Sequence, residues 1–482
     1  MSLYYSFERG KEIKLGSDDV DDMVRGFSFL GTDQKVILAP FLKAFGIATK
    51  IHEERIELRD NGHPQYQNSE KILNDDSKGV KEEVLLHILE DTQKDLSRWK
   101  ETKEKCLERV PRLLLFNNSQ LLGFMRRTLD SLVSASKRGD KVVNWNPIMP
   151  YLKLIFSKED WLKIVESLNL SVQKLKLLER VDQLEERILD ICSELIFDLQ
   201  EHLGVDIEQF GDKGTALVYN ASRLTERQQE ILLLSDVYSY EIPLPYQLFE
   251  CYSTSMVPQL EDFRIFLKRA SKFTDLKFTI FGVNFLPSQY KEELVKMLLD
   301  ETLPRELALI FTQDISVEMF TFVKRADFTL QSENDFKKAI AAANLLDNCK
   351  IKTLQHVSGR PGDGKTTYIA SEAKKIINNN PQSKFVIVSV NENFKPSMFH
   401  EKIRFDDTIT TAVVHFNISA FGSFFSFHQM IRRLFFSGFL IDDEIGDIEM
   451  LSPTISWTIY VEIPCIIPQI SDKPVIEYLP LI

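Results

Sequence analysis

The sequence contains little cysteine, and its cysteines are far apart. They number five in 482 residues and form no C-x-x-C pair: Cys106, Cys192, Cys251, Cys349 and Cys465. The eight histidines likewise show no H-E-x-x-H or comparable ligand spacing. Because zinc modules need closely spaced cysteine and histidine ligands, this pattern excludes a zinc module that is evident from sequence. Sparse, unpaired cysteines are typical of reduced thiols, so we expect a cytoplasmic protein.

Long apolar runs and an excess of positive charge are also absent. No apolar run approaches the ~18 residues that a transmembrane helix needs. The N-terminal stretch MSLYYSFERGKEIKLG lacks the apolar core of a signal peptide. A net charge of −12 and a pI near 5.4 argue against a general nucleic-acid or anionic-membrane surface. We therefore predict no transmembrane segment and no nucleic-acid partner.

The length and the hydrophobic fraction predict several domains rather than one. A chain of 482 residues, 44% hydrophobic, can build two to four compact units with sizeable cores. Residues 1–70 hold short apolar pieces separated by turn signals. Residues 71–215 predict a helical domain, because apolar residues recur there at three- and four-residue steps, as in Leu184, Ile188, Ile191, Leu195, Leu199 and Leu203. A packed amphipathic helix is favoured over a short coiled coil, since the heptad is neither strict nor sustained.

The segment 216–330 predicts an α/β unit without a phosphate-binding loop. Its expected elements alternate in the order strand 247–252, helix 260–270, strand 277–283, helix 288–300 and strand 306–312. Such alternation predicts a parallel sheet with right-handed crossovers. After the first strand stands Ser-Thr-Ser-Met (253–256), with neither glycine nor lysine. We expect an α/β architecture there, but no phosphate cradle.

The segment 331–482 carries the most informative motif, a glycine-rich turn between a predicted strand and a predicted helix. The turn GRPGDGKT (359–366) matches G-x-x-x-x-G-K-[ST]. Glycines let successive backbone N–H groups cradle phosphate oxygens, and the helix N-terminus adds partial positive charge. Lys365 would contact the β- and γ-phosphates, and the Thr366 hydroxyl would bind Mg²⁺. The predicted ATP and Mg²⁺ site comprises Gly359, Arg360, Pro361, Gly362, Asp363, Gly364, Lys365, Thr366 and Thr367.

The acidic residue that a hydrolysing P-loop protein uses has no clear counterpart in the sequence. The strands predicted after the P-loop helix are 384–390, 411–418 and 458–463. The acid would be expected on the second of these, where Asn417 stands and cannot supply a carboxylate. Asp442 to Glu444 form an acidic string but follow a predicted apolar helix over 424–440, so we expect them at a helix end or turn. Glu462 lies where a sensing residue is expected, and a purely structural role fits it equally well. The sequence thus predicts nucleotide binding with slow or absent hydrolysis.

Five stretches, taken in order, resemble a known family. They are 241–270, 278–295, GRPGDGKTTYI (359–369), VVHFNIS (413–419) and TIYVEIP (458–464). In order and spacing they resemble the dynein-like AAA+ core of mysterin-like giant RING-type E3 ubiquitin ligases, over about 235–465. The resemblance implies a large helical N-terminal part, a degenerate AAA-like unit at 216–330 and a P-loop AAA+ unit at 331–482 that is truncated at its C-terminus.

The resemblance also implies partners and a longer chain. The P-loop unit would hold ATP tightly, with slow or absent hydrolysis. Its partners would be the remaining AAA units and the E3 module of a longer chain, and through that module the ubiquitin-conjugating machinery. No residue of this sequence is assigned to ubiquitin transfer, since it has no RING. Two other functions stay open: an active ATPase that uses Glu462 or Asp442, and a non-enzymatic helical scaffold with a relic P-loop.

Overall fold

The computed structural model describes the chain from residue 39 to residue 464, with gaps. The described residues are 39–66, 82–140, 142–156, 160–179, 184, 187–204, 215–224, 229, 232–233, 245–251, 258, 260–273, 276–299, 306–313, 324–325, 351–360, 362–391, 393–405, 408–418, 427, 430–431, 433–434, 439–442, 446–452 and 454–464. They fall into two compact units. The first is Met1–Leu113, Asn118–Val143 and Glu166–Glu201, and the second is Leu114–Asn117, Asn144–Val165 and His202–Ile482. The predicted domain boundaries near 70 and 330 lie outside the described residues and stay predictions.

Helices account for the regular structure described between residues 39 and 204. They are α4 (Ala39–Asp60), α5 (Glu82–Arg109), α6 (Asn118–Arg138), α7 (Met149–Ile155), α8 (Trp161–Leu175) and α9 (Ile188–Leu203). The helices α4 and α5 share a small apolar cluster in which Ile47, Ile51 and Leu85 are buried. The helix α9 buries Leu195 and Leu199 of the periodic series. None of the helices in the described ranges is long and apolar enough to cross a membrane.

The first sheet is parallel, as predicted. Its described strands are β1 (Thr215–Asn220), β2 (Leu248–Glu250), β3 (Lys277–Phe281), β4 (Glu306–Phe311) and β5 (Lys324–Arg325), in the order β2-β3-β4-β1-β5. Every pairing is parallel. The crossover helices α11 (Leu260–Lys272) and α12 (Ser288–Leu299) confirm the predicted alternation. The prediction missed β1, which pairs with β4, and β5, which pairs with β1.

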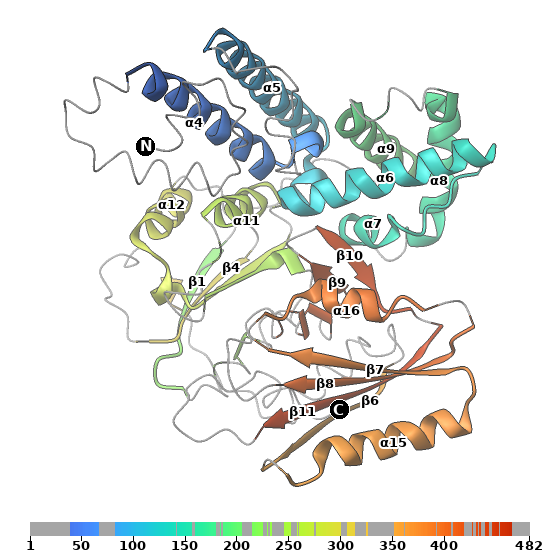
Figure 1. The fold of residues 1–482 in the computed structure, drawn as a ribbon. Helices are drawn as coiled ribbons and strands as arrows, with labels where there is room; N and C mark the ends of the chain where they lie inside the picture. Colours follow the sequence, from blue (N-terminus) through green and yellow to red (C-terminus); the bar gives the residue numbers. More distant parts are fainter. Residues whose placement is uncertain are drawn as a thin grey trace. The chain divides into compact units, whose positions relative to one another are not determined.

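The second sheet carries the P-loop and is also parallel. Its strands are β6 (Ile351–Gly359), β7 (Ser383–Val390), β8 (Thr411–Ile418) and β11 (Ser456–Pro464), in the order β6-β11-β8-β7. The last of the described strands, β11, is thus inserted next to β6. The helix α15 (Lys365–Asn379) lies along one face of this sheet, and α16 (Pro396–Lys402) lies on the other (Figure 1). The protein is therefore a mixed α/β protein with parallel sheets.

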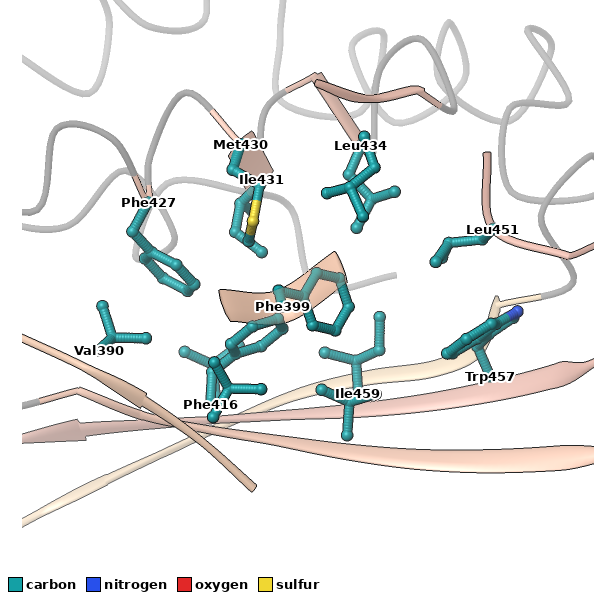
Figure 2. Packing of buried hydrophobic residues seen from close by; sticks show 14 of the residues in the cluster. Val390, Phe399, Phe416, Phe427, Met430, Ile431, Leu434, Leu451, Trp457 and Ile459 are labelled. Atoms are coloured by element: carbon teal, nitrogen blue, oxygen red, sulfur yellow. The ribbon is translucent and has the colours of Figure 1, made fainter. Parts of the chain in front are cut away.

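An aromatic core fixes the sheet face that lies opposite α15. Phe399 of α16 contacts Phe416 of β8 at a ring-centroid distance of 5.0 Å, and Phe416 contacts Phe427 at 5.1 Å. Figure 2 shows these rings above the strands, with Ile459 and Trp457 of β11 in the same layer. On the α15 face, Ile369 and Ala373 pack against Val413 and Tyr460 in a smaller cluster. Because residues alternate between the faces of a strand, the even-numbered Phe416 and the odd-numbered Val413 of β8 serve different layers.

One predicted helix is partly wrong. Described residues at 427, 430–431 and 433–434 are helical, but Phe439–Asp442 forms a strand, β9, which overlaps the last two residues of the span 424–440 predicted as helix. This strand pairs antiparallel with β10 (Asp447–Met450) in a two-stranded sheet. Asp442, expected at a helix end or turn, therefore lies in a strand, opposite Asp447. A short buried apolar run such as Phe439–Ile441 reads equally well as helix or strand, and the turn at Gly446, with φ of 72°, favours the hairpin. Asp443 and Glu444 lie outside the described residues.

Candidate nucleotide-binding site

The strand, loop and helix predicted around the glycine-rich motif are present. The strand β6 ends at Gly359, and α15 begins at Lys365. Gly362 and Gly364 have φ values of 89° and 77°, in the left-handed region that side chains with a Cβ seldom adopt. Gly364 is the N-cap residue of α15. These glycines allow the chain to reverse between strand and helix, so the helix N-terminus faces the loop. Pro361 lies outside the described residues.

Polar contacts within the loop hold the Lys365 ammonium and the Asp363 carboxylate. The Lys365 ammonium donates to the carbonyl oxygens of Gly359 and Arg360, at 2.9 and 3.0 Å. The backbone N–H of Arg360 donates to the Asp363 carboxylate at 2.7 Å. A Cβ at Gly359 would come within 3.1 Å of that carboxylate, a tight contact. A phosphate would therefore bind by replacing the carbonyl partners of Lys365, whose charge already lies over the loop.

A carboxylate from another strand meets the first turn of α15. The Thr366 hydroxyl donates to the Glu462 carboxylate, at 3.0 Å to Oε1 and 2.9 Å to Oε2. Glu462 lies on β11, opposite Val357 of β6 on one side and Asn417 of β8 on the other. It is 8% exposed, whereas Thr366 is exposed. A P-loop hydroxyl beside a strand carboxylate is the arrangement that holds Mg²⁺ in P-loop proteins.

A buried histidine, His415, also contacts the Glu462 carboxylate. His415 Nε2 lies 2.9 Å from Glu462 Oε2, and the histidine is 1% exposed. Burial lowers the pKa of His415, and the carboxylate of Glu462 opposes that shift. The ring is therefore neutral near pH 7, and its Nε2–H donates to Glu462. Its plane lies nearly parallel to the ring of Phe385 on β7, at an angle of 4° and a centroid distance of 6.4 Å.

Of the two candidate acids, Glu462 contacts the P-loop helix and Asp442 lies in a different sheet. Glu462 contacts Thr366 directly, and Asn417 lies beside it in register on β8. Asp442 belongs to the separate β9-β10 hairpin and is fully buried. Among the described residues, no group of three or more His, Cys, Asp or Glu side chains is placed to hold a metal ion. A Mg²⁺ ion at Thr366 and Glu462 would therefore take its remaining ligands from nucleotide phosphates and water, as Mg²⁺ usually does.

The sequence reasoning missed His415. It stands in an apolar run, Val413-Val414-His415-Phe416, that reads only as a buried strand. Its spacing from Asn417 could have identified it. Residues two positions apart lie on the same face of a strand, so His415 shares a face with Asn417, where the acid was expected. Glu462 itself was predicted only as one of two alternative acids.

The first sheet has a different, closely packed structure at the corresponding edge. Gly282, just after β3, has φ of 75°, and a Cβ there would lie 1.8 Å from the carbonyl oxygen of Cys251. Cys251 follows β2 and is buried. The backbones of the two strand ends thus approach each other closely at Gly282. The segment 253–256, predicted to lack a phosphate cradle, lies outside the described residues.

Comparisons with known proteins add no family to this geometry. No protein-family model matches the chain, and a search of curated proteins finds no relative.

Proposed function

We propose that residues 331–482 form a P-loop AAA+ unit that binds ATP with Mg²⁺ and retains it as a structural or regulatory ligand. The observation that carries the proposal is the hydrogen bond from Thr366 to Glu462, which completes the motif with a carboxylate. Lys365 would contact the β- and γ-phosphates in place of its present carbonyl partners. The N–H groups of the first turn of α15 and the left-handed glycines would cradle the phosphate oxygens. The residues present fit both ATP and Mg²⁺.

Slow hydrolysis is part of the proposal. A base that activates water must have a free oxygen within hydrogen-bond reach of that water. Here the Glu462 carboxylate already accepts hydrogen bonds from Thr366, at both oxygens, and from His415, at Oε2. Its neighbour in register, Asn417, has an amide, which cannot accept a proton from water at neutral pH. Glu462 would thus serve the metal, and Asn417 beside it would supply no second carboxylate to act as the base.

The wider setting follows from the resemblance of the sequence to mysterin-like E3 ubiquitin ligases. We infer that 216–330 is a degenerate AAA-like unit, a role that suits the closely packed edge at Gly282 and Cys251. The order β6-β11-β8-β7, with the last strand inserted beside the P-loop strand, supports an AAA+ unit at 331–482. The partners would be further AAA units and an E3 module of a longer cytoplasmic chain, and through that module the ubiquitin-conjugating machinery.

The test is to release nucleotide from purified protein with denaturant and to identify it by chromatography. Lys365→Ala removes the phosphate contact, and Lys375→Ala is the matched control, an exposed lysine of the same helix that pairs only locally with Glu372. Intact ATP from wild type and Lys375→Ala, but not from Lys365→Ala, supports the proposal. If no nucleotide is recovered and added Mg-ATP does not bind, the proposal is wrong and a scaffold with a relic P-loop is favoured.

An active ATPase is the second candidate, and the contact of Glu462 with Thr366 favours it over an ATPase that uses Asp442. In that case the released nucleotide would be ADP, and Glu462→Gln would abolish turnover. Turnover that survives Lys365→Ala would come from a contaminant.

A further inference from the structure

We propose that His415 is a positioning residue: it holds the Glu462 carboxylate on the metal side of the P-loop, so that the binding of a divalent cation together with ATP depends on it. This inference rests on the proposed function of the site. His415 would touch neither the nucleotide nor the metal, and it would act through Glu462 alone.

The argument starts from the surroundings of the imidazole. His415 is 1% exposed, and its Nδ1 atom has no hydrogen-bond partner among the described residues. Among the described residues, its ring hydrogen-bonds Glu462, with 2.9 Å between Nε2 and Oε2. Burying a polar ring is costly unless its polar atoms are used. A purely structural residue at this position of β8 could be apolar, like its neighbours Val413 and Phe416, which are fully buried.

The second step is the geometry of the carboxylate. Glu462 accepts hydrogen bonds from two elements, from Thr366 of α15 at both oxygens and from His415 of β8 at Oε2. A glutamate side chain has three rotatable bonds, and two contacts from different elements restrict it to one orientation. With His415 removed, Thr366 alone would hold the carboxylate, and Thr366 is exposed. The carboxylate could then turn away from the position that a metal ion would occupy.

The third step is the size of the effect. Residues that orient a metal-binding side chain typically change metal affinity about 10–100-fold when they are replaced. We expect an effect of that size here, confined to the part of ATP binding that requires the metal.

The experiment measures ATP affinity with Mg²⁺ and with EDTA, for wild type, His415→Phe and His415→Gln. Phe keeps the packing but removes the donor, whereas Gln can place its amide N–H near the position of Nε2. His400→Phe is the matched control, because His400 is equally buried in the same sheet unit but contacts Glu449, not Glu462. We expect His415→Phe to weaken Mg-ATP binding about 10–100-fold without changing ATP binding in EDTA. His415→Gln and His400→Phe should bind Mg-ATP like wild type.

Two outcomes would overturn the proposed role of His415 while leaving the proposed function intact. One is an unchanged Mg-ATP affinity of His415→Phe. The other is an equal loss of ATP affinity with Mg²⁺ and with EDTA, which would indicate a structural role. If wild type binds ATP in neither condition, the proposed function fails and this inference fails with it. Should His415→Phe not fold, as judged by its melting temperature, His415→Asn replaces it, because its shorter amide does not reach Glu462. Equal Mg-ATP affinities of His415→Asn, His415→Gln and wild type would then overturn the inference.

Discussion

The Thr366 hydroxyl hydrogen-bonds both oxygens of the Glu462 carboxylate, at 3.0 and 2.9 Å, although the two residues are 96 positions apart in the sequence. The bond joins the first turn of α15 to β11, the strand beside the P-loop strand. It places a negative charge next to a hydroxyl that a P-loop protein uses to bind Mg²⁺.

Glu462→Gln should weaken ATP binding in Mg²⁺ but not in EDTA. The amide keeps the size of the side chain and can still accept the Thr366 proton, but it loses the charge that would attract the cation. A contact to a charged group is worth about 1.5–3 kcal/mol, so we expect Mg-ATP affinity to fall roughly 10–100-fold. Titration calorimetry in the two conditions measures this. Equal affinity of Glu462→Gln and wild type in Mg²⁺ would show that Glu462 does not serve the metal.

Asp442→Asn should leave nucleotide retention unchanged. Asp442 lies in the β9-β10 hairpin, whereas the P-loop belongs to the other sheet of strands β6, β11, β8 and β7. The substitution can change stability, because Asp442 is fully buried, so the melting temperature is recorded beside the retained ATP. A folded Asp442→Asn protein that releases no ATP would place this acid at the site and contradict our assignment.

The sequence predicted the parts of this site that depend on local patterns. The loop with Gly362 and Gly364, the strand before it and the helix after it follow from turn chemistry and periodicity. The contact between Thr366 and Glu462 could not be predicted, because it depends on which strand is inserted beside β6. Strand order is set by pairings between distant segments, and the apolar runs of β8 and β11 are compatible with several orders. For the same reason the sequence indicates the position of Asn417 for the acid, although Glu462 lies next to it.

The missed elements have a similar cause. The strand β1 has only six residues and no partner nearby in the sequence, since it pairs with β4 and β5. The strand β9 has four residues, Phe439–Asp442, within an apolar stretch long enough for a helix. Periodicity cannot separate helix from strand over so short a run.

The first unit should lose stability on mild acidification because of His63. Burial lowers the pKa of His63, with the Asp95 carboxylate opposing the shift, and the Gln65 N–H donates to the neutral Nδ1 at 3.3 Å. The unfolded chain therefore binds more protons than the folded one just below the ordinary histidine pKa of about 6.5. Stability is fully present above that value and is lost as the pH falls toward the folded pKa.

Urea denaturation between about pH 7 and pH 5 measures this loss. His63→Phe should flatten the pH dependence, because the ring that contacts Tyr66 edge-on and Trp99 at a tilt no longer takes up a proton. His87→Phe is the matched control on an exposed part of α5, where the histidine side chain is 72% exposed. Identical slopes for wild type and His63→Phe would contradict the role of His63.

Gly282→Ala should destabilise the second unit by about 2 kcal/mol or more, because φ is +75° and the new Cβ would lie 1.8 Å from the Cys251 carbonyl oxygen. Gly46→Ala is the contrasting variant: Gly46 lies in α4, and a Cβ there meets no atom within 4 Å. It should stabilise its helix by about 0.5–1 kcal/mol. Chemical denaturation compares the two variants, and an unchanged unfolding free energy for Gly282→Ala would mean that the two strand ends do not approach as closely as described.

The measurement that tests the account most directly is the affinity of wild type and Lys365→Ala for Mg-ATP, by titration calorimetry, with Lys375→Ala as the control. The Lys365 ammonium contacts the carbonyl oxygens of Gly359 and Arg360. In the complex it would contact the phosphates instead. The account predicts that ATP binds wild type and Lys375→Ala equally, and Lys365→Ala about 10- to 100-fold more weakly, the cost of one charged contact. Equal binding by all three proteins, or no binding by wild type, would contradict it.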